Sequence, residues 1–424
     1  MKTLARTIIG LLLATAGYVA NAFDLAGVDV RGQAEGSWQY APLRDTSVFN
    51  PIGRIVNSPA QTGYLGLRLS PQYSKGPVTL RGDYWGQAKL ADSNGRGDFY
   101  TQTSALDWNI TGSLVLSGGV DLFKWGPGYI WNPSNPFQDR ELNFVDRVIS
   151  YKRNGDVYSS LDWTGSNGFG ATAYYVNNKS REKIYGANAS YDNSLAVKLR
   201  KQFTSSDTAL TYALLGDMNF LGGSYSVTVG SKLELHSEFS VRDRRRTVLP
   251  VFIADANGPG GYYALQPNSK VQWRPQFLAG GQYTTEEQYN YILEYFYNGE
   301  GYSKHEFGQL ENAAAVSTTQ LQSPYAPAAT GFLGSANHLL GSAERHYLFA
   351  RAATDHLVGD LEAKASLRYG IQDSGITLSG LLRYPIFKSA GLLLGGQYYN
   401  NPAHSETGAI PFEFVLYSGI SLIL

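Results

Sequence analysis

The sequence contains no cysteine. Disulfides, thiolate metal sites and c-type haem attachment are therefore excluded, and so is a lipoprotein, because no cysteine is available for acylation. Neither sign of charge is in excess, since 35 basic residues balance 35 acidic ones. Nucleic-acid binding by bulk electrostatic attraction is therefore not expected. Charged residues are also sparse, at 17% of the chain, against roughly 25% in soluble domains.

Long apolar runs are missing as well. The apolar run near the N-terminus, Ile8 to Val19, is shorter than the roughly 20 residues of a membrane-spanning helix. It follows Lys2 and Arg6 and precedes the small-residue motif Ala20-Asn21-Ala22, which is the order of a secretory signal peptide. The alternative is an N-terminal membrane anchor. We expect residues 1–22 to be removed on export, so that a membrane location would be reached through strands.

Glycine and aromatic residues are abundant instead, with 47 glycines, 30 tyrosines and 19 phenylalanines. This composition favours β-sheet with tight turns. Residues 23–424 contain no linker, no low-complexity tract and no shift in composition. We therefore expect them to form a single domain.

Apolar and polar residues alternate over many segments of about ten residues, as in a β-barrel in lipid. The pattern is clear in residues 28–40, 78–90 and 360–369. A soluble β-sandwich also alternates, but its apolar face is a packed core of large aliphatic residues. Here the apolar faces contain many glycines and alanines, which favours a surface against lipid tails.

Short turns and longer connections separate these segments and are expected to alternate strictly, as periplasmic turns and extracellular loops do. The prediction is about 18 strands, with 16 to 20 as the range, and both termini in the periplasm. The least regular segment is 208–229, read as one long strand that Gly222-Gly223 could break. The short turns are 74–76, 111–113, 166–168, 192–194, 230–232, 284–286, 356–359 and 388–391, and the longer connections are 41–62, 91–98, 126–146, 177–182, 201–207, 244–269, 299–344, 371–375 and 400–411.

The last strand resembles the C-terminal assembly signal of outer-membrane barrels. Ser418, Gly419 and Leu422 match that signal, whereas Leu424 stands where an aromatic residue is usual. In architecture, though in no diagnostic motif, residues 23–424 resemble a porin-like Gram-negative outer-membrane β-barrel. The resemblance implies an all-β, transmembrane, antiparallel up-and-down barrel. It also implies as partners the outer-membrane lipid and lipopolysaccharide, the barrel assembly machinery, small solutes and either a homotrimer or a periplasmic protein.

A barrel of this size is too wide to be filled by side chains, so an aqueous lumen is expected. Its predicted lining mixes both signs of charge, which would either orient polar solutes or pair locally within a wetted interior. The lining candidates on strands or beside them are Arg31, Glu35, Arg68, Arg81, Asp83, Lys89, Asp121, Lys124, Arg200, Arg242 and Arg368.

The third long connection, 126–146, and the residue before it are rich in proline and aromatic side chains. In position and length the connection resembles the third loop of general porins, which folds into the lumen and narrows it. The alternative is a loop on the barrel rim whose aromatic side chains bury one another. The constriction candidates are Trp125, Tyr129, Trp131, Asp139 and Arg140.

Two other loops have features of interest. Residues 299–344 could form a short helix or a lid, or a mobile surface loop. The basic run Arg242-Asp243-Arg244-Arg245-Arg246 could pair with lipopolysaccharide phosphates, or lie at the lumen rim or in solvent.

Catalysis has little support, because the six histidines show no metal-ligand spacing and no serine lies in a nucleophile-elbow pattern. We expect no enzyme, metal or cofactor. The leading hypothesis is a porin-like channel for passive diffusion of small hydrophilic solutes or ions. The alternatives are a barrel that sheathes an exported polysaccharide or a multihaem cytochrome, a surface enzyme, and an adhesin.

Overall fold

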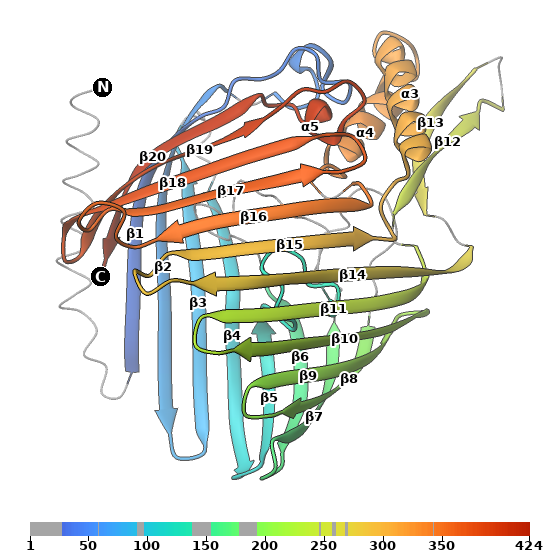
Figure 1. Ribbon diagram of the computed structural model, residues 1–424. Helices are drawn as coiled ribbons and strands as arrows, with labels where there is room; N and C mark the ends of the chain where they lie inside the picture. Colours follow the sequence, from blue (N-terminus) through green and yellow to red (C-terminus); the bar gives the residue numbers. More distant parts are fainter. Residues whose placement is uncertain are drawn as a thin grey trace.

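The protein forms a closed β-barrel (Figure 1). The computed structural model describes residues 28–57, 59–90, 97–137, 154–177, 193–245, 247–256, 260–267, 270–341 and 343–424. The expected signal peptide, residues 1–22, lies outside these ranges. Within them, an 18-stranded antiparallel sheet closes on itself because β1 (Val28–Tyr40) pairs with β20 (Phe414–Ile423). The predicted transmembrane-type up-and-down barrel of about 18 strands is confirmed.

The strands follow one another around the barrel in chain order. Between β1 and β20 these are β2 (Gln61–Lys75), β3 (Val78–Lys89), β4 (Gly97–Thr111), β5 (Leu114–Asp121), β6 (Asp156–Thr164), β7 (Phe169–Asn177), β8 (Asn193–Gln202), β9 (Ser206–Leu215), β10 (Met218–Val229), β11 (Leu233–Arg244), β14 (Val271–Thr284), β15 (Asn290–Asn298), β16 (His346–Thr354), β17 (Glu362–Gly370), β18 (Ile376–Phe387) and β19 (Ala390–Tyr399). The other two strands, β12 (Val248–Ala254) and β13 (Gly261–Pro267), form a separate hairpin.

Side chains alternate between the two faces of the wall, as the pleat of a strand requires. On β6, buried and exposed residues alternate from Asp156 to Leu161. Large apolar side chains are exposed around the outside of the barrel, among them Leu67, Leu80, Leu116, Leu161, Leu210, Leu293, Leu378 and Leu394. An apolar belt of this extent is the surface that lipid tails cover in a transmembrane barrel.

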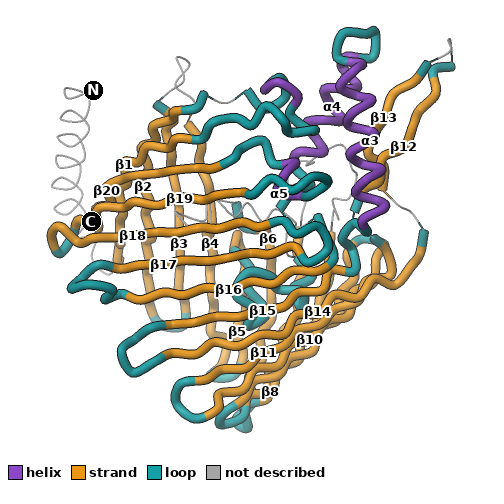
Figure 2. Tube along the Cα trace, turned by 45° about the horizontal axis from the view of Figure 1, so that its top comes forward, coloured by secondary structure: helices purple, strands orange, loops and turns teal. Residues whose placement is uncertain are grey.

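The two ends of the barrel differ in their connections. At one end, the short-turn end, tight turns join β2 to β3, β4 to β5 and each later pair in the same way. The other, long-loop end carries η1 (Pro51–Gly53), the β12–β13 hairpin, α3 (Lys304–Gln320), α4 (Ala326–Asn337) and α5 (Glu406–Ala409) (Figure 2). The connection 299–344 thus contains two helices. No helix in the described ranges is long and apolar enough to cross a membrane.

The loops of the long-loop end pack into a small apolar cluster of their own, called here the loop cap. Its buried members include Phe49 from the first loop, Phe307 and Leu310 from α3, and Phe332 and Leu333 from α4. Helix α3 begins with a capping box in which the Ser303 side chain accepts from the Glu306 amide. The cap is therefore a folded unit above the barrel mouth.

The reading of 208–229 as one strand is wrong. The segment forms a hairpin in which β9 and β10 pair, with Leu215 opposite Met218. Gly216, at φ 62°, supplies the positive φ that tight two-residue turns often require. Gly222 and Gly223 lie inside β10 instead, where a Cβ would come within 2.7 Å of the Phe220 ring and 2.6 Å of the Phe239 ring, respectively.

The short turn predicted at 192–194 is also wrong in its described residues. Asn193 and Ser194 begin β8 rather than forming a turn, and residues 203–205 are a short turn at the short-turn end rather than a long connection. The strand expected between 183 and 191 lies outside the described residues. Two strands, β9 and β10, stand where one was expected over 208–229. The additional strand offsets the one expected at 183–191, so the observed number of strands equals the predicted 18. The strict alternation of short and long connections fails at the two-residue turn between β9 and β10.

Candidate functional site

The chain after β5 enters the barrel (Figure 1). Its described part, residues 122–137, is called here the internal loop. It packs against inward-facing side chains of β6 to β11 on one side, and of β14, β15 and β16 on the other. The internal loop therefore lies within the lumen rather than on the rim.

Glu238 on β11 holds the internal loop at its middle. Its Oε1 accepts a hydrogen bond from the Gly128 amide at 2.7 Å, while its Oε2 accepts from the Ser134 amide at 3.0 Å and the Ser134 hydroxyl at 2.7 Å. The carboxylate is buried, at 1% exposure. A Cβ at Gly126 would overlap it, so the close approach of the backbone depends on glycine there.

Glu294 on β15 holds the same stretch from a second strand. Its Oε1 accepts from the Tyr129 amide at 2.6 Å, and its Oε2 lies 3.4 Å from the Ile130 amide. His236 Nε2 lies 3.0 Å from the same Oε1. Glu294 is fully buried. Two wall carboxylates thus bind backbone amides within residues 128–134 of the loop.

Side-chain hydrogen bonds hold the loop together, and aromatic ring contacts fix it to the wall. Asn132 donates to the Gly128 carbonyl at 2.8 Å, and Asn135 to the Phe123 carbonyl at 2.9 Å. Trp125 is buried and packs against Phe137 at 5.3 Å and Tyr174 at 4.8 Å, and Trp131 stacks on Phe296 at 4.9 Å. The aromatic side chains bury one another, as the alternative interpretation of this loop has it, but they do so inside the barrel.

Among the constriction candidates within the described residues, Tyr129 is the one whose side chain is exposed. Its side chain is 42% exposed, whereas Trp125 and Trp131 are buried. The ring stacks on Phe349 at 5.7 Å, and the Arg351 guanidinium lies 4.8 Å from its centre. Arg351 was not among the sequence candidates, although it alternates with apolar residues on β16 as an inward residue should. Asp139 and Arg140 lie outside the described residues.

The charges of the opposite wall are paired with one another. Arg68 donates to Asp83 at 2.8 and 2.5 Å. Arg81 donates to Asp107 at 2.7 Å and reaches Asp121 at 3.4 Å. These groups are partly exposed, with the Arg68 side chain at 42% and the Arg81 side chain at 38%. The wall between β2 and β5 therefore presents locally compensated charge.

The remaining lining candidates divide by burial. Arg31, Lys124 and Arg200 are exposed and Lys89 is half-buried. Glu35, Arg242 and Arg368 are buried, at 2%, 1% and 3% exposure. Arg242 pairs with Glu300 at 3.3 Å and Arg368 with Glu406 at 3.3 Å. These two arginines, expected to line an open lumen, therefore serve internal ion pairs beneath the loop cap.

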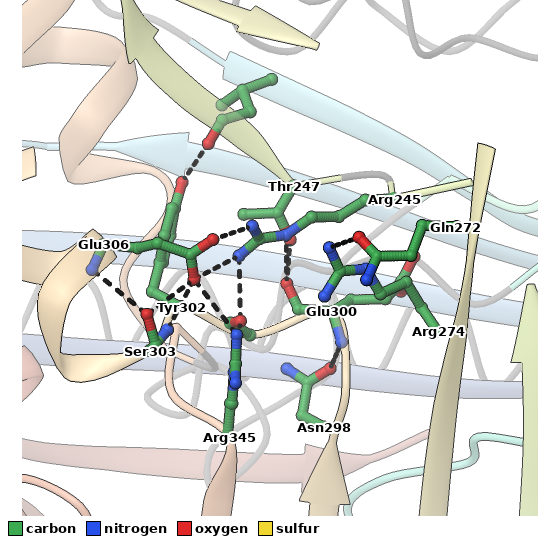
Figure 3. A network of polar contacts seen from close by, with 12 residues as sticks. Arg245, Thr247, Gln272, Arg274, Asn298, Glu300, Tyr302, Ser303, Glu306 and Arg345 are labelled. Atoms are coloured by element: carbon green, nitrogen blue, oxygen red, sulfur yellow. Dashed lines mark hydrogen bonds and ion pairs between the residues drawn. The ribbon is translucent and has the colours of Figure 1, made fainter. Parts of the chain in front are cut away.

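The described arginines of the basic run that begins at Arg242 pair with acidic side chains of the protein itself, and this corrects the expectation of phosphate binding for the buried Arg242 and Arg245. Arg245 donates to both carboxylate oxygens of Glu306, at 2.5 and 3.3 Å, and to the carbonyl of Gly301 at 2.9 Å (Figure 3). Arg345 reaches Glu306 Oε2 at 3.3 Å. Arg244 pairs with Asp217, and Arg246 lies outside the described residues.

Glu306 is therefore the acid that anchors α3 to the barrel rim. Burial works against its charge, but hydrogen bonds from Arg245 and Ser303 outweigh burial and lower the pKa of Glu306 to about 2. The carboxylate is ionised at neutral pH and forms ion pairs with Arg245 and Arg345. Figure 3 shows these residues converging from β11's end, α3 and the segment before β16.

A second acidic cluster joins the loop cap to the far side of the rim. Glu406 accepts from the Gly341 amide and the Tyr347 hydroxyl, both at 2.5 Å. Asp373 accepts from the Glu406 amide at 2.6 Å. Burial, and then the hydrogen bond with Asp373, raise the pKa of Glu344 to about 11, so this carboxyl is protonated at neutral pH. Among the described residues, no three His, Asp or Glu side chains are arranged to hold a metal ion.

The residues of the expected assembly signal lie on β20 and just beyond it. Ser418 pairs with Trp38 and Gly419 with Ser37, while Leu422 lies opposite Ala34. Leu424 lies against Gly32, where its Cβ would be 2.9 Å from a Cβ added to the glycine. These contacts are part of barrel closure, and a role in assembly remains a prediction.

No family model and no curated protein matches the chain. Solved structures do. The barrel is similar to OccAB1 of Acinetobacter baumannii, with a TM-score of 0.54 and 8% identity over 94% of this chain and 97% of that one. It is also similar to OccK8 (OprE) of Pseudomonas aeruginosa, with a TM-score of 0.52 and 11% identity over 94% and 98%, and to OccAB3 of A. baumannii, with 0.50 and 11% over 94% and 100%. At these identities the likeness shows a common porin-like barrel fold.

Proposed function

We propose that this protein is an outer-membrane channel through which small hydrophilic solutes or ions diffuse passively. The observation that carries the proposal is a closed barrel of 18 strands whose lumen is crossed by a loop fixed to the wall. The solved structures with this fold support it. The pore narrows at the internal loop, where the Tyr129 side chain is exposed and the partly buried Arg351 lies beside its ring. No reaction is catalysed.

The proposal includes export and orientation. Residues 1–22 act as a cleaved signal peptide, and residues 23–424 form the barrel domain. The short-turn end, with both ends of the mature chain, faces the periplasm, and the loop cap faces outward among the lipopolysaccharide. Ser418, Gly419, Leu422 and Leu424 contribute to recognition by the barrel assembly machinery. The proposed protein partner is either further copies of the chain in a homotrimer or a periplasmic protein, and crosslinking in membranes would distinguish the two.

The internal loop also favours a solute pore over a sheath for a larger partner. Its clamp to Glu238 and Glu294 places backbone and ring systems across the space that a multihaem cytochrome or a polysaccharide chain would need. A pore for small solutes needs only the passage beside the loop. The loop therefore acts as a size filter.

Solute flux into vesicles tests the proposal. Liposomes containing the refolded protein should swell in small sugars and amino acids, with a rate that falls steeply as solute size increases. Empty liposomes, and liposomes with heat-denatured protein, are the controls. A folded barrel that gives no swelling with any solute would contradict the proposal.

Arg351 offers a finer test of the constriction. Replacing it in the Arg351→Gln variant removes a positive charge beside Tyr129, so the channel should become more cation-selective. The reversal potential in a salt gradient measures this shift. Lys201→Gln, which removes a positive charge near the Phe203 ring at the short-turn end, is the matched control and should leave selectivity unchanged.

A further inference from the structure

We propose that Glu238 and Glu294 are positioning residues of the pore, which fix the internal loop in the lumen and so set conductance. The inference rests on the proposed channel function and goes beyond it by assigning roles to two side chains that no solute needs to touch. Both are buried and both bind loop backbone.

The clamp meets a physical need of the loop. The described part of the internal loop has neither helix nor strand, so its amides lack the partners that regular structure provides. Amides buried without an acceptor cost free energy. The two carboxylates accept from Gly128, Tyr129, Ile130 and Ser134, which leaves this stretch satisfied only while it stays against the wall.

The need is mutual, because a buried carboxylate must itself be stabilised. Glu238 is stabilised by two loop amides and the Ser134 hydroxyl, and Glu294 by loop amides and His236. Hydrogen bonds to an ionised acceptor are the stronger kind. The loop and the wall therefore stabilise each other's polar groups in one arrangement.

The clamp acts on the one ring of the loop that faces the passage. Trp125 and Trp131 are held by apolar packing on either side. Between them, the amide of Tyr129 is bound directly by Glu294 and that of Gly128 by Glu238. Loss of the clamp would therefore free Tyr129 from Phe349 and Arg351 while the flanking tryptophans remain anchored.

The test compares Glu238→Gln and Glu294→Gln with Glu234→Gln in planar bilayers. Glutamine keeps the side-chain size but places an NH₂ group against loop amides that are themselves donors. We expect roughly a tenfold fall in the ratio of clamped to released loop, seen as larger and noisier single-channel currents. Glu234 lies on the same strand, at an inward position nearer the short-turn end, and its variant should match the wild type.

A second measurement reports on the loop without requiring conduction. The chain has no cysteine, so a nitroxide can be attached at Tyr129→Cys in the wild-type, Glu238→Gln and Glu234→Gln backgrounds. The label should gain mobility with Glu238→Gln and not with Glu234→Gln. Heat-modifiable mobility on gels confirms that each barrel is folded, and Ser134→Ala, which removes one of the bonds to Glu238, should give a smaller change in the same direction.

The outcomes separate the two proposals. A wild-type barrel that does not conduct, but whose label is released by Glu238→Gln, would overturn the channel function and leave the clamp standing. Unchanged currents and unchanged label mobility in folded Glu238→Gln and Glu294→Gln barrels would overturn the clamp. If those barrels fail to fold, Ser134→Ala decides: mobility equal to the wild type would contradict the proposal.

Discussion

At the residue scale, Glu306 links the stability of the loop cap to pH. The folded pKa, about 2, lies below the ordinary value of a glutamate, so the contribution of this carboxylate is present above that ordinary value and is lost as the pH falls toward 2. Replacing it in the Glu306→Gln variant removes the charge that Arg245 and Arg345 share. We expect a loss of roughly 1–3 kcal/mol in local stability at pH 7.

Hydrogen exchange of the α3 amides measures this loss. Exchange should be faster in Glu306→Gln than in the wild type at pH 7, and the difference should shrink in acid as the wild-type carboxylate becomes protonated. Lys304→Gln, which removes a charge from an exposed side chain of the same helix, is the control. An equal difference at pH 7 and in strong acid would contradict the assignment.

The carboxyl of Glu344 is expected to make stability depend on pH in the opposite direction. Its folded pKa, about 11, lies above its ordinary value, so folding binds a proton and stability is lost as the pH rises from that ordinary value toward 11. Glutamine retains a donor for Asp373 and cannot ionise. Glu344→Gln should therefore equal the wild type in mild acid and be more stable at pH 9, as measured by thermal unfolding of the loop cap. A variant less stable than the wild type at pH 9 would exclude a protonated Glu344.

At the element scale, the glycines inside β10 leave space for aromatic rings and do not form a turn. A Cβ at Gly223 would lie 2.6 Å from the Phe239 ring and 3.0 Å from the Ala209 carbonyl. Gly223→Val should therefore overpack this part of the wall, at a cost of about 1–3 kcal/mol. The midpoint of urea unfolding measures the effect. Gly380→Val is the control, because the nearest atom to its Cβ would be 3.9 Å away, and equal midpoints for both variants would contradict the argument.

The same element explains a limit of prediction from sequence. Alternation and turn composition were sufficient for most strands, because each pattern is local to its hairpin. They failed at 192–229, because a glycine pair can either end a strand or leave space for aromatic rings. The rings beside Gly222 and Gly223 belong to Phe220 and Phe239, and only the pairing register of β10 with β11 places the Phe239 ring there. The true turn at Gly216-Asp217 is only two residues long and lies beside apolar residues on both sides.

The internal loop was predictable in place but not in its contacts. The position and length of the connection after β5 indicated a loop in the lumen, with a loop on the rim as the alternative. That Glu238 and Glu294 hold it follows from contacts between segments more than 100 residues apart, which no local sequence pattern indicates. Arg242, Arg245 and Arg368 misled for the same reason, because their acidic partners lie in loops distant in sequence.

At the scale of the whole molecule, the barrel combines an apolar outer belt, paired charges on one inner wall and a fixed loop across the lumen. The folded loop cap stands above one end of the barrel. Together these features describe a narrow aqueous passage whose shape depends on a few buried acids. The outer belt requires lipid or detergent, so each measurement must be made on the folded barrel in one of them.

Single-channel recording of the refolded wild-type barrel in planar bilayers tests the central claim most directly. The account predicts discrete, stable conductance steps that scale with salt concentration, from protein shown to be folded by its heat-modifiable gel mobility. Folded protein that inserts into the bilayer and yet gives no conductance steps at any salt concentration would contradict a passive aqueous pore.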